Sequence, residues 1–180
     1  MLFNTIDFII FFIIVFSLIV IIKNRKFQHL YLLLASFFFL YYSNNYLIIL
    51  LILSTILDFY VGKEIWKTKK ILNKKILLTL SIIGNLGLLG FYKYADFSIS
   101  QFNDLGNSLG IATDIPLLNL ILPVGISFYT FQTLSYTIDI YRGKLTPSES
   151  IKEFALFVSF FPQLVAGPIE RVSNLVHQLQ

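Results

Sequence analysis

The stretch Phe8-Ile-Ile-Phe-Phe-Ile-Ile-Val-Phe-Ser-Leu-Ile-Val-Ile-Ile22, followed by Lys23-Asn-Arg-Lys26, decides the class of fold. It is apolar except for Ser17 and ends in a basic tetrad, which is typical of a somewhat short membrane-spanning helix. The residues before it lack the basic region and the cleavage site of a secretory signal peptide. We therefore expect this segment to persist in the mature protein.

The composition extends this interpretation to the whole chain. Of 180 residues, 56% are hydrophobic and 13% are charged, and the mean hydropathy is +0.75. An average soluble domain carries about 25% charged residues, so a water-soluble globule is disfavoured. At roughly 20 residues for each spanning helix, the chain has room for about six crossings.

Further apolar segments follow the first one. Two runs, 30–42 and 46–61, are split by Ser43-Asn-Asn45 and predict a helical hairpin with a tight turn. A fourth helix is expected over 76–94 and a polar exposed loop over 95–116. A fifth span is expected over 117–141, broken near Pro123 and Gly125. Thr146-Pro-Ser-Glu149 resembles a helix start, and the segment from Phe154 is interrupted by Pro162 and Gly167-Pro168. We predict an all-α, polytopic transmembrane helix bundle of about five spans plus a kinked or re-entrant sixth segment.

The basic residues give this bundle an orientation. With the N-terminus outside, the inner loops are 23–29, 62–75 and 142–153, and these hold 12 of the 14 Lys and Arg residues. Short inner loops are enriched in Lys and Arg, so the alternation supports both the number of spans and an outside N-terminus. The basic residues form short clusters between apolar runs, which does not indicate nucleic-acid binding.

Polar residues inside the apolar segments need partners. Asp58 and Asp139 lie near Lys63 and Arg142, and we expect ion pairs at the membrane interface, with the lining of a polar cavity as the alternative. Ser127, Thr130, Thr133 and Thr137 share one face of the fifth helix, where either hydrogen bonds between helices or a wet cavity would explain them. Gly84, Gly87 and Gly90 predict close packing of the fourth helix.

The composition excludes some kinds of functional site and disfavours others. The chain has no cysteine, which excludes disulfides, thiolate metal sites and a Cys nucleophile. His29 lies in a basic loop and His177 in a polar tail segment, so we expect no metal site.

Two strings resemble one family. They are Ile121-Leu-Pro-Val-Gly-Ile-Ser-Phe-Tyr-Thr-Phe-Gln-Thr-Leu-Ser-Tyr-Thr-Ile-Asp-Ile-Tyr-Arg-Gly-Lys144 and Phe154-Ala-Leu-Phe-Val-Ser-Phe-Phe-Pro-Gln-Leu-Val-Ala-Gly-Pro-Ile-Glu-Arg171. Together they closely resemble the membrane-bound O-acyltransferase family, in its bacterial branch typified by the alginate O-acetylation protein. The pattern of the N-terminal hairpin and basic loop agrees, so the resemblance covers nearly the whole chain.

The resemblance implies transfer of an acyl group, often acetyl, from an inner-side donor to a hydroxyl of an envelope or exported polysaccharide. It implies a multi-pass protein of the bacterial cytoplasmic membrane, an acyl donor such as acetyl-CoA or an acyl carrier, no covalently bound cofactor, and partners among acyl-donor and polysaccharide export or modification proteins. A His is the family's presumed base, which suits a hydroxyl nucleophile.

The family's catalytic His lies well beyond Gly-Pro-Ile-Glu-Arg171, and this chain ends nine residues after Arg171. We therefore expect residues 1–180 to be one transmembrane region, the N-terminal half of a longer domain, with no catalytic residue and no activity alone. The positions that match the family motifs are predicted to line or shape a tunnel, with Gln163 and Arg171 as the better candidates for polar contacts. They are Tyr129, Gln132, Pro162, Gln163, Gly167, Pro168, Glu170 and Arg171.

Two other functions fit the composition. One is a small polytopic scaffold or partner subunit of a membrane complex without enzymatic activity, which would pack through the Gly face and the polar fifth helix. The other is a small transporter, suggested by the breaks near 123 and 162. The transporter interpretation lacks an internal inverted repeat and an unambiguous ionisable residue at the midplane.

Overall fold

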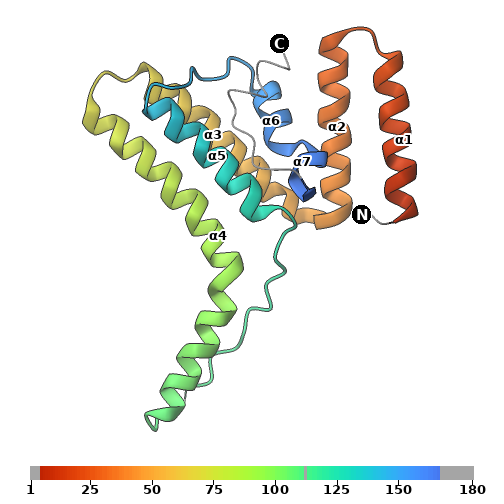
Figure 1. Cartoon of the computed structure of the whole chain (residues 1–180). Helices are drawn as coiled ribbons and strands as arrows, with labels where there is room; N and C mark the ends of the chain where they lie inside the picture. Colours follow the sequence, from red (N-terminus) through yellow and green to blue (C-terminus); the bar gives the residue numbers. More distant parts are fainter. Residues whose placement is uncertain (1–4, 112, 167–180) are drawn as a thin grey trace.

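The regular secondary structure of the computed structural model is helical throughout residues 5–111 and 113–166, the part of the chain that it describes (Figure 1). The elements are α1 (Ile6–Ile21), α2 (Arg25–Asn44), the short 3-10 helix η1 (Asn45–Leu47), α3 (Ile48–Lys67), α4 (Ile71–Ser108), α5 (Ile126–Tyr141), α6 (Ile151–Ser159) and α7 (Phe161–Ala166). The all-α prediction is thereby confirmed. Two stretches, Arg25–Lys67 and Ile71–Ser108, are long and apolar enough to cross a membrane, while α1 is apolar but shorter.

α1 and α2 form an antiparallel pair at one side of the bundle (Figure 1). The turn between them is closed by Gln28, whose Nε2 donates to the carbonyl oxygens of Ile22 at 2.7 Å and Ile19 at 3.3 Å. Aromatic rings join the pair to α7, since Phe11 packs against Phe161 with centroids 5.2 Å apart. The predicted first span is thus confirmed as a helix.

The break at Ser43-Asn-Asn45 is a tight turn, as predicted. Asn45 adopts a left-handed φ of 50°, which Asn tolerates better than most residues. The side chain of Asn44 bonds the backbone of Val124 twice: its Nδ2 donates to the carbonyl at 3.1 Å, and its Oδ1 accepts from the amide at 2.7 Å. The turn therefore also fixes the segment that leads into α5.

α4 is longer than the sequence predicts. It has 38 residues and, at about 1.5 Å per residue, a length of about 57 Å. The prediction of a loop over 95–116 is wrong for residues 95–108. The polar side chains there bind the returning chain: the carboxylate of Asp96 accepts from the amides of Leu118 and Leu120, and Asn103 both accepts from and donates to the backbone of Ile115.

The fifth helix also begins later than predicted. Residues 117–122 have no regular secondary structure, and α5 starts only after Gly125, which has a φ of 83°. The predicted break at Pro123 and Gly125 is therefore the start of the helix. In Figure 1 the returning segment runs beside the far half of α4 before it reaches α5.

α6 and α7 are separated at Phe160, whose backbone torsions, φ −56° and ψ 105°, are not helical. Pro162 is the second residue of α7, in the first turn, where the missing N–H of proline costs no helical hydrogen bond. The predicted interruption at Pro162 is confirmed. The predicted helix start at Thr146-Pro-Ser-Glu149 is wrong, because α6 begins at Ile151 with Ser150 as its N-cap, accepting from the amide of Glu153.

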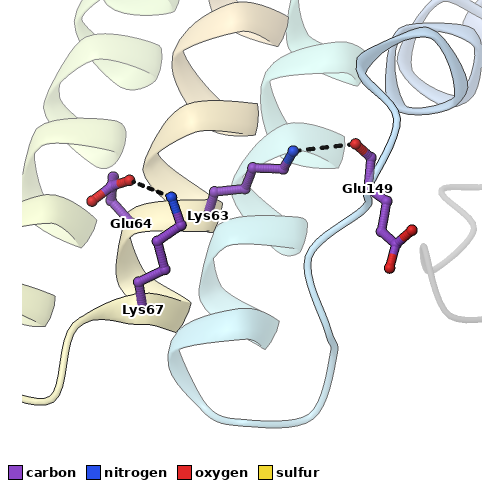
Figure 2. A network of polar contacts seen from close by, with 4 residues as sticks. All are labelled: Lys63, Glu64, Lys67 and Glu149. Carbon is purple, nitrogen blue, oxygen red and sulfur yellow. Dashed lines mark hydrogen bonds and ion pairs between the residues drawn. The ribbon is translucent and has the colours of Figure 1, made fainter.

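The three basic connections lie at the same end of the bundle. The turns at 22–24, 68–70 and 142–150 all lie toward the top of Figure 1, and the turn at Asn45 lies at the other end. Lys63 ties two of them together, since its Nζ donates to the backbone carbonyl of Glu149 at 3.1 Å (Figure 2). Lys67 pairs with Glu64 at 3.2 Å on the exposed surface of α3.

α3 and α5 lie side by side (Figure 1) and are in close contact at Gly62. A Cβ at this position would lie 2.8 Å from Tyr136 Cε1 and 2.9 Å from Ile140 Cδ1. Tyr136 is fully buried, and its hydroxyl accepts from the amide of Ser148 at 3.1 Å. The ring therefore has little room to move aside.

We expect Gly62→Ala to lower the free energy of unfolding by about 1–3 kcal/mol, because the added methyl overpacks the α3–α5 contact. Gly87→Ala is the matched control, since no described atom lies within 4 Å of a Cβ there. In the control, the better helix propensity of Ala should raise stability by up to about 1 kcal/mol. Thermal unfolding in detergent micelles measures both variants, and equal shifts would contradict the close contact.

Candidate functional site in the polar core of the bundle

A cluster of polar side chains is buried where α3, α4 and α5 meet. Each of these side chains is at most 2% exposed. We call this cluster the Asp58 network; its members are Ser54 and Asp58 on α3, Ser81 and Asn85 on α4, and Thr133 and Thr137 on α5. Burying so many polar groups is tolerable only if they bond to one another.

The Asp58 carboxyl group is the centre of the network. Its Oδ1 accepts from the hydroxyl of Ser81 at 2.5 Å, and its Oδ2 accepts from Nδ2 of Asn85 at 2.8 Å. The Asn85 Oδ1 in turn accepts from Ser54 and, at 3.4 Å, from Thr133. A contact of 3.2 Å between the hydroxyls of Ser81 and Thr137 completes the link to α5. The network therefore connects three helices through hydrogen bonds.

The predicted ion pair between Asp58 and Lys63 is wrong. Asp58 is fully buried and bonds to α4, whereas Lys63 lies over the Phe59 ring at 4.3 Å and reaches the loop before α6. Five residues along a helix turn a side chain away from its neighbour, so the two groups point in different directions. Asp139 and Arg142 likewise form no ion pair within the part of the chain that the structure describes.

The predictions for the hydroxyls and glycines are resolved in part. Thr133 and Thr137 make hydrogen bonds between helices, which favours that interpretation of the polar face of α5. Gly84 is a close contact, since a Cβ there would lie 2.9 Å from Leu57 Cδ2 on α3. At Gly87 and Gly90 the prediction is wrong for the described residues, none of which comes within 4 Å of an added Cβ.

Another side of α5 faces α6 and carries Gln132, one of the motif residues. Gln132 is fully buried, and its Nε2 donates to the carbonyl of Phe157 at 3.1 Å. Nearby, the hydroxyl of Ser36 on α2 accepts from the amide of Phe161. Three buried polar atoms, Tyr129 Oη, Gln132 Oε1 and Ser159 Oγ, have no hydrogen-bond partner within residues 5–111 and 113–166. Such groups are costly to bury without a partner.

Four of the eight residues predicted to line a tunnel lie within the part of the chain that the structure describes. Tyr129 and Gln132 are buried on α5, and Gln163 is buried on α7 beside the half-buried Pro162. Gly167, Pro168, Glu170 and Arg171 lie outside the described residues. A tunnel formed by these positions stays a prediction.

Sequence reasoning missed the Asp58 network. The signal was present, since Ser54 and Asp58, and also Ser81 and Asn85, are four residues apart and so share a helix face. The spacing alone does not predict that the polar face of α3 packs against the polar face of α4.

Large apolar side chains cover the outside of these helices, and their interior holds the Asp58 network beside a hydrophobic core. The exposed set includes Ile9, Phe16, Leu34, Leu53 and Ile83. A water-soluble protein does not expose so extensive an apolar surface. The fold and its polar core therefore define an integral membrane helix bundle.

Comparison with known proteins narrows this class. The chain is 43% identical over 101 residues, 56% of its length, to a probable alginate O-acetylase AlgI of Pseudomonas aeruginosa, and covers 19% of that protein. It is 36% identical over 125 residues, 69% of its length, to a protein of the same name from Azotobacter vinelandii, and covers 25% of it. It is also 35% identical over 151 residues, 71% of its length, to a peptidoglycan O-acetyltransferase of Helicobacter pylori, and covers 28% of that protein.

These matches confirm the resemblance to the membrane-bound O-acyltransferase family. The chain spans about a fifth to a quarter of the length of the curated relatives it matches. No family model matches the chain. No solved structure matches it either.

We expect Asp58→Ala to destabilise the bundle, because Ser81 and Asn85 each lose the acceptor of a buried hydrogen bond. Each donor left unpaired costs roughly 1–3 kcal/mol. Asp104→Ala, on the exposed surface of α4, should change stability by less than about 0.5 kcal/mol. Unfolding of both variants in detergent, followed by circular dichroism, makes the comparison; similar midpoints would show that the network adds little.

Proposed function

We propose that this chain is the N-terminal part of a membrane O-acetyltransferase of the membrane-bound O-acyltransferase family. The complete enzyme moves an acetyl group from an inner-side donor, acetyl-CoA or an acyl carrier, to a hydroxyl of an envelope or exported polysaccharide. The observation that carries the proposal is the similarity to proteins named for O-acetylation of alginate and of peptidoglycan. Acceptors in both cases are sugar hydroxyls, so acyl transfer to a polysaccharide is the shared chemistry.

The residues of this chain have a positioning role in that reaction. A hydroxyl nucleophile needs a base of near-neutral pKa, and we propose that the base is a His outside residues 1–180. Tyr129, Gln132 and Gln163 then orient the donor or the acceptor from the α5, α6 and α7 side. The unpartnered atoms of Tyr129 and Gln132 support this role, because a substrate would complete their hydrogen bonds. Alone, the chain is inactive.

We propose further that the chain crosses the cytoplasmic membrane about five times, with α6 and α7 as a kinked sixth segment and the N-terminus outside. The clustering of 12 of the 14 basic residues at three connections and the adjoining helix ends supports the orientation, as does the position of these connections at one end of the bundle. Acyl-donor proteins and polysaccharide export or modification proteins are the proposed partners.

The orientation is testable by labelling, because the chain has no cysteine. We expect Asn107→Cys, near the end of α4, to react in intact cells with a membrane-impermeant maleimide. Thr68→Cys and Ser148→Cys, in two of the basic connections, should react only after permeabilisation. The reverse pattern would contradict the orientation, and labelling of all three in intact cells would contradict the span count.

The reaction is testable in the organism that encodes the chain. Disrupting the gene should remove base-labile acetyl esters from the peptidoglycan or from an exported polysaccharide, measured by mass spectrometry of both polymers. Restoring the full gene should restore the esters. An unchanged acetyl content in both polymers would overturn the proposed function and favour a non-enzymatic subunit.

Tyr129→Phe separates a positioning role from a structural one. With the variant placed in the full gene, removing a hydroxyl that has no described partner should leave stability unchanged, while acetylation falls about tenfold through the loss of one substrate hydrogen bond. Tyr136→Phe is the control: it loses the bond to Ser148 and about 1 kcal/mol of stability, but keeps its acetylation. Full acetylation by the Tyr129 variant would exclude the proposed role.

A further inference from the structure

An open groove of about 540 Å³ lies at the end of the α1–α2 pair. Its lining is mostly apolar, with Ile21 from α1 and Phe27, Leu30 and Leu34 from α2, and Lys23 and Asn24 of the connecting turn add polar groups. The groove is therefore amphiphilic, because it combines a charged side chain with an apolar lining.

The turn between the two helices gives the groove a fixed form. Gln28 holds the last carbonyls of α1, and Asn24 caps α2 by accepting from the amide of Lys26 at 3.0 Å. Asn24 also lines the groove, so the N-terminus of α2 lies beside it, and the partial positive charge of that helix end adds to the charge of the lysines.

The turn at the end of the groove carries exposed positive charge. Lys23, Arg25 and Lys26 are exposed, and the sequence contains no Asp or Glu between Asp7 and Asp58. Lys23 and Lys26 form no ion pair with any residue that the structure describes. A ligand with an anionic head and an apolar body matches this arrangement in charge and in polarity.

We propose that this groove binds one anionic phospholipid of the membrane. Lys23 and Lys26 contact the headgroup phosphate, and one acyl chain lies along Phe27, Leu30 and Leu34. A zwitterionic lipid matches the apolar walls without supplying net charge, and a soluble phosphate compound supplies the charge without filling the walls. The site is separate from the α5–α6 polar residues, so it stands independently of acyl transfer.

Native mass spectrometry of the full 180-residue chain in detergent tests the site. We titrate phosphatidylglycerol and phosphatidylcholine with identical acyl chains and expect phosphatidylglycerol to bind at least about tenfold more tightly. The double variant Lys23→Ala, Lys26→Ala should abolish this preference. The matched control, Lys69→Ala, Lys70→Ala, removes the same charge from the α3–α4 connection and should retain the preference.

A second pair of variants tests the apolar wall. Leu30→Trp narrows the groove and should weaken phosphatidylglycerol binding several-fold, whereas Leu53→Trp, at an exposed position on α3, should not. Circular dichroism confirms that each variant is folded. Three results would overturn the proposal. The two lipids could bind with equal affinity, or both double lysine variants could lose the preference for phosphatidylglycerol to the same extent. Alternatively, inorganic phosphate or coenzyme A at matched concentration could displace phosphatidylglycerol.

Discussion

A carboxyl group buried inside an apolar helix bundle has to be hydrogen bonded, and this constraint organises the rest of the structure. Asp58 is fully buried on α3, and Ser81 and Asn85 on α4 satisfy its oxygens. Because lipid provides no hydrophobic driving force between helices, helices in a membrane associate through packing and polar contacts of this kind. The pairing sets which faces of α3 and α4 meet, and Gly62 then lets α5 lie directly against α3.

α5 consequently has two polar sides of different character. Toward α3 and α4 its threonines join a network in which the buried groups bond to one another. The same helix also carries Gln132, whose Nε2 bonds to α6, and Tyr129; Gln132 Oε1 and Tyr129 Oη lack hydrogen-bond partners in the described chain. A satisfied network stabilises a fold, whereas unsatisfied buried atoms are costly unless a ligand or water completes them. This contrast separates the residues that hold the bundle together from those proposed to contact substrate.

Local pattern was sufficient for much of this fold. Long apolar runs predicted the first three helices, and the polar break at Asn45 and the ring of Pro162 predicted where the chain turns or is interrupted. Tertiary partners were not predictable in the same way. Residues 95–108 are polar because Asp96 and Asn103 bind the returning segment, yet in the sequence alone they resemble a loop. Similarly, Lys63 is close to Asp58 in sequence, and the true partners are more than twenty residues away. At the site, the family motif indicated Tyr129 and Gln132, but neither their burial nor their unpaired atoms followed from it.

The coupling between Asp58 and Asn85 tests this account most directly. A double-mutant cycle with Asp58→Ala and Asn85→Ala, followed by reversible unfolding in detergent, isolates the interaction between α3 and α4 from other effects of each substitution. The account predicts a coupling energy of about 0.5–3 kcal/mol, with the double variant less destabilised than the sum of the single ones. Additivity within about 0.3 kcal/mol would contradict it, because the hydrogen bond between Asp58 and Asn85 would then contribute nothing to holding the two helices together.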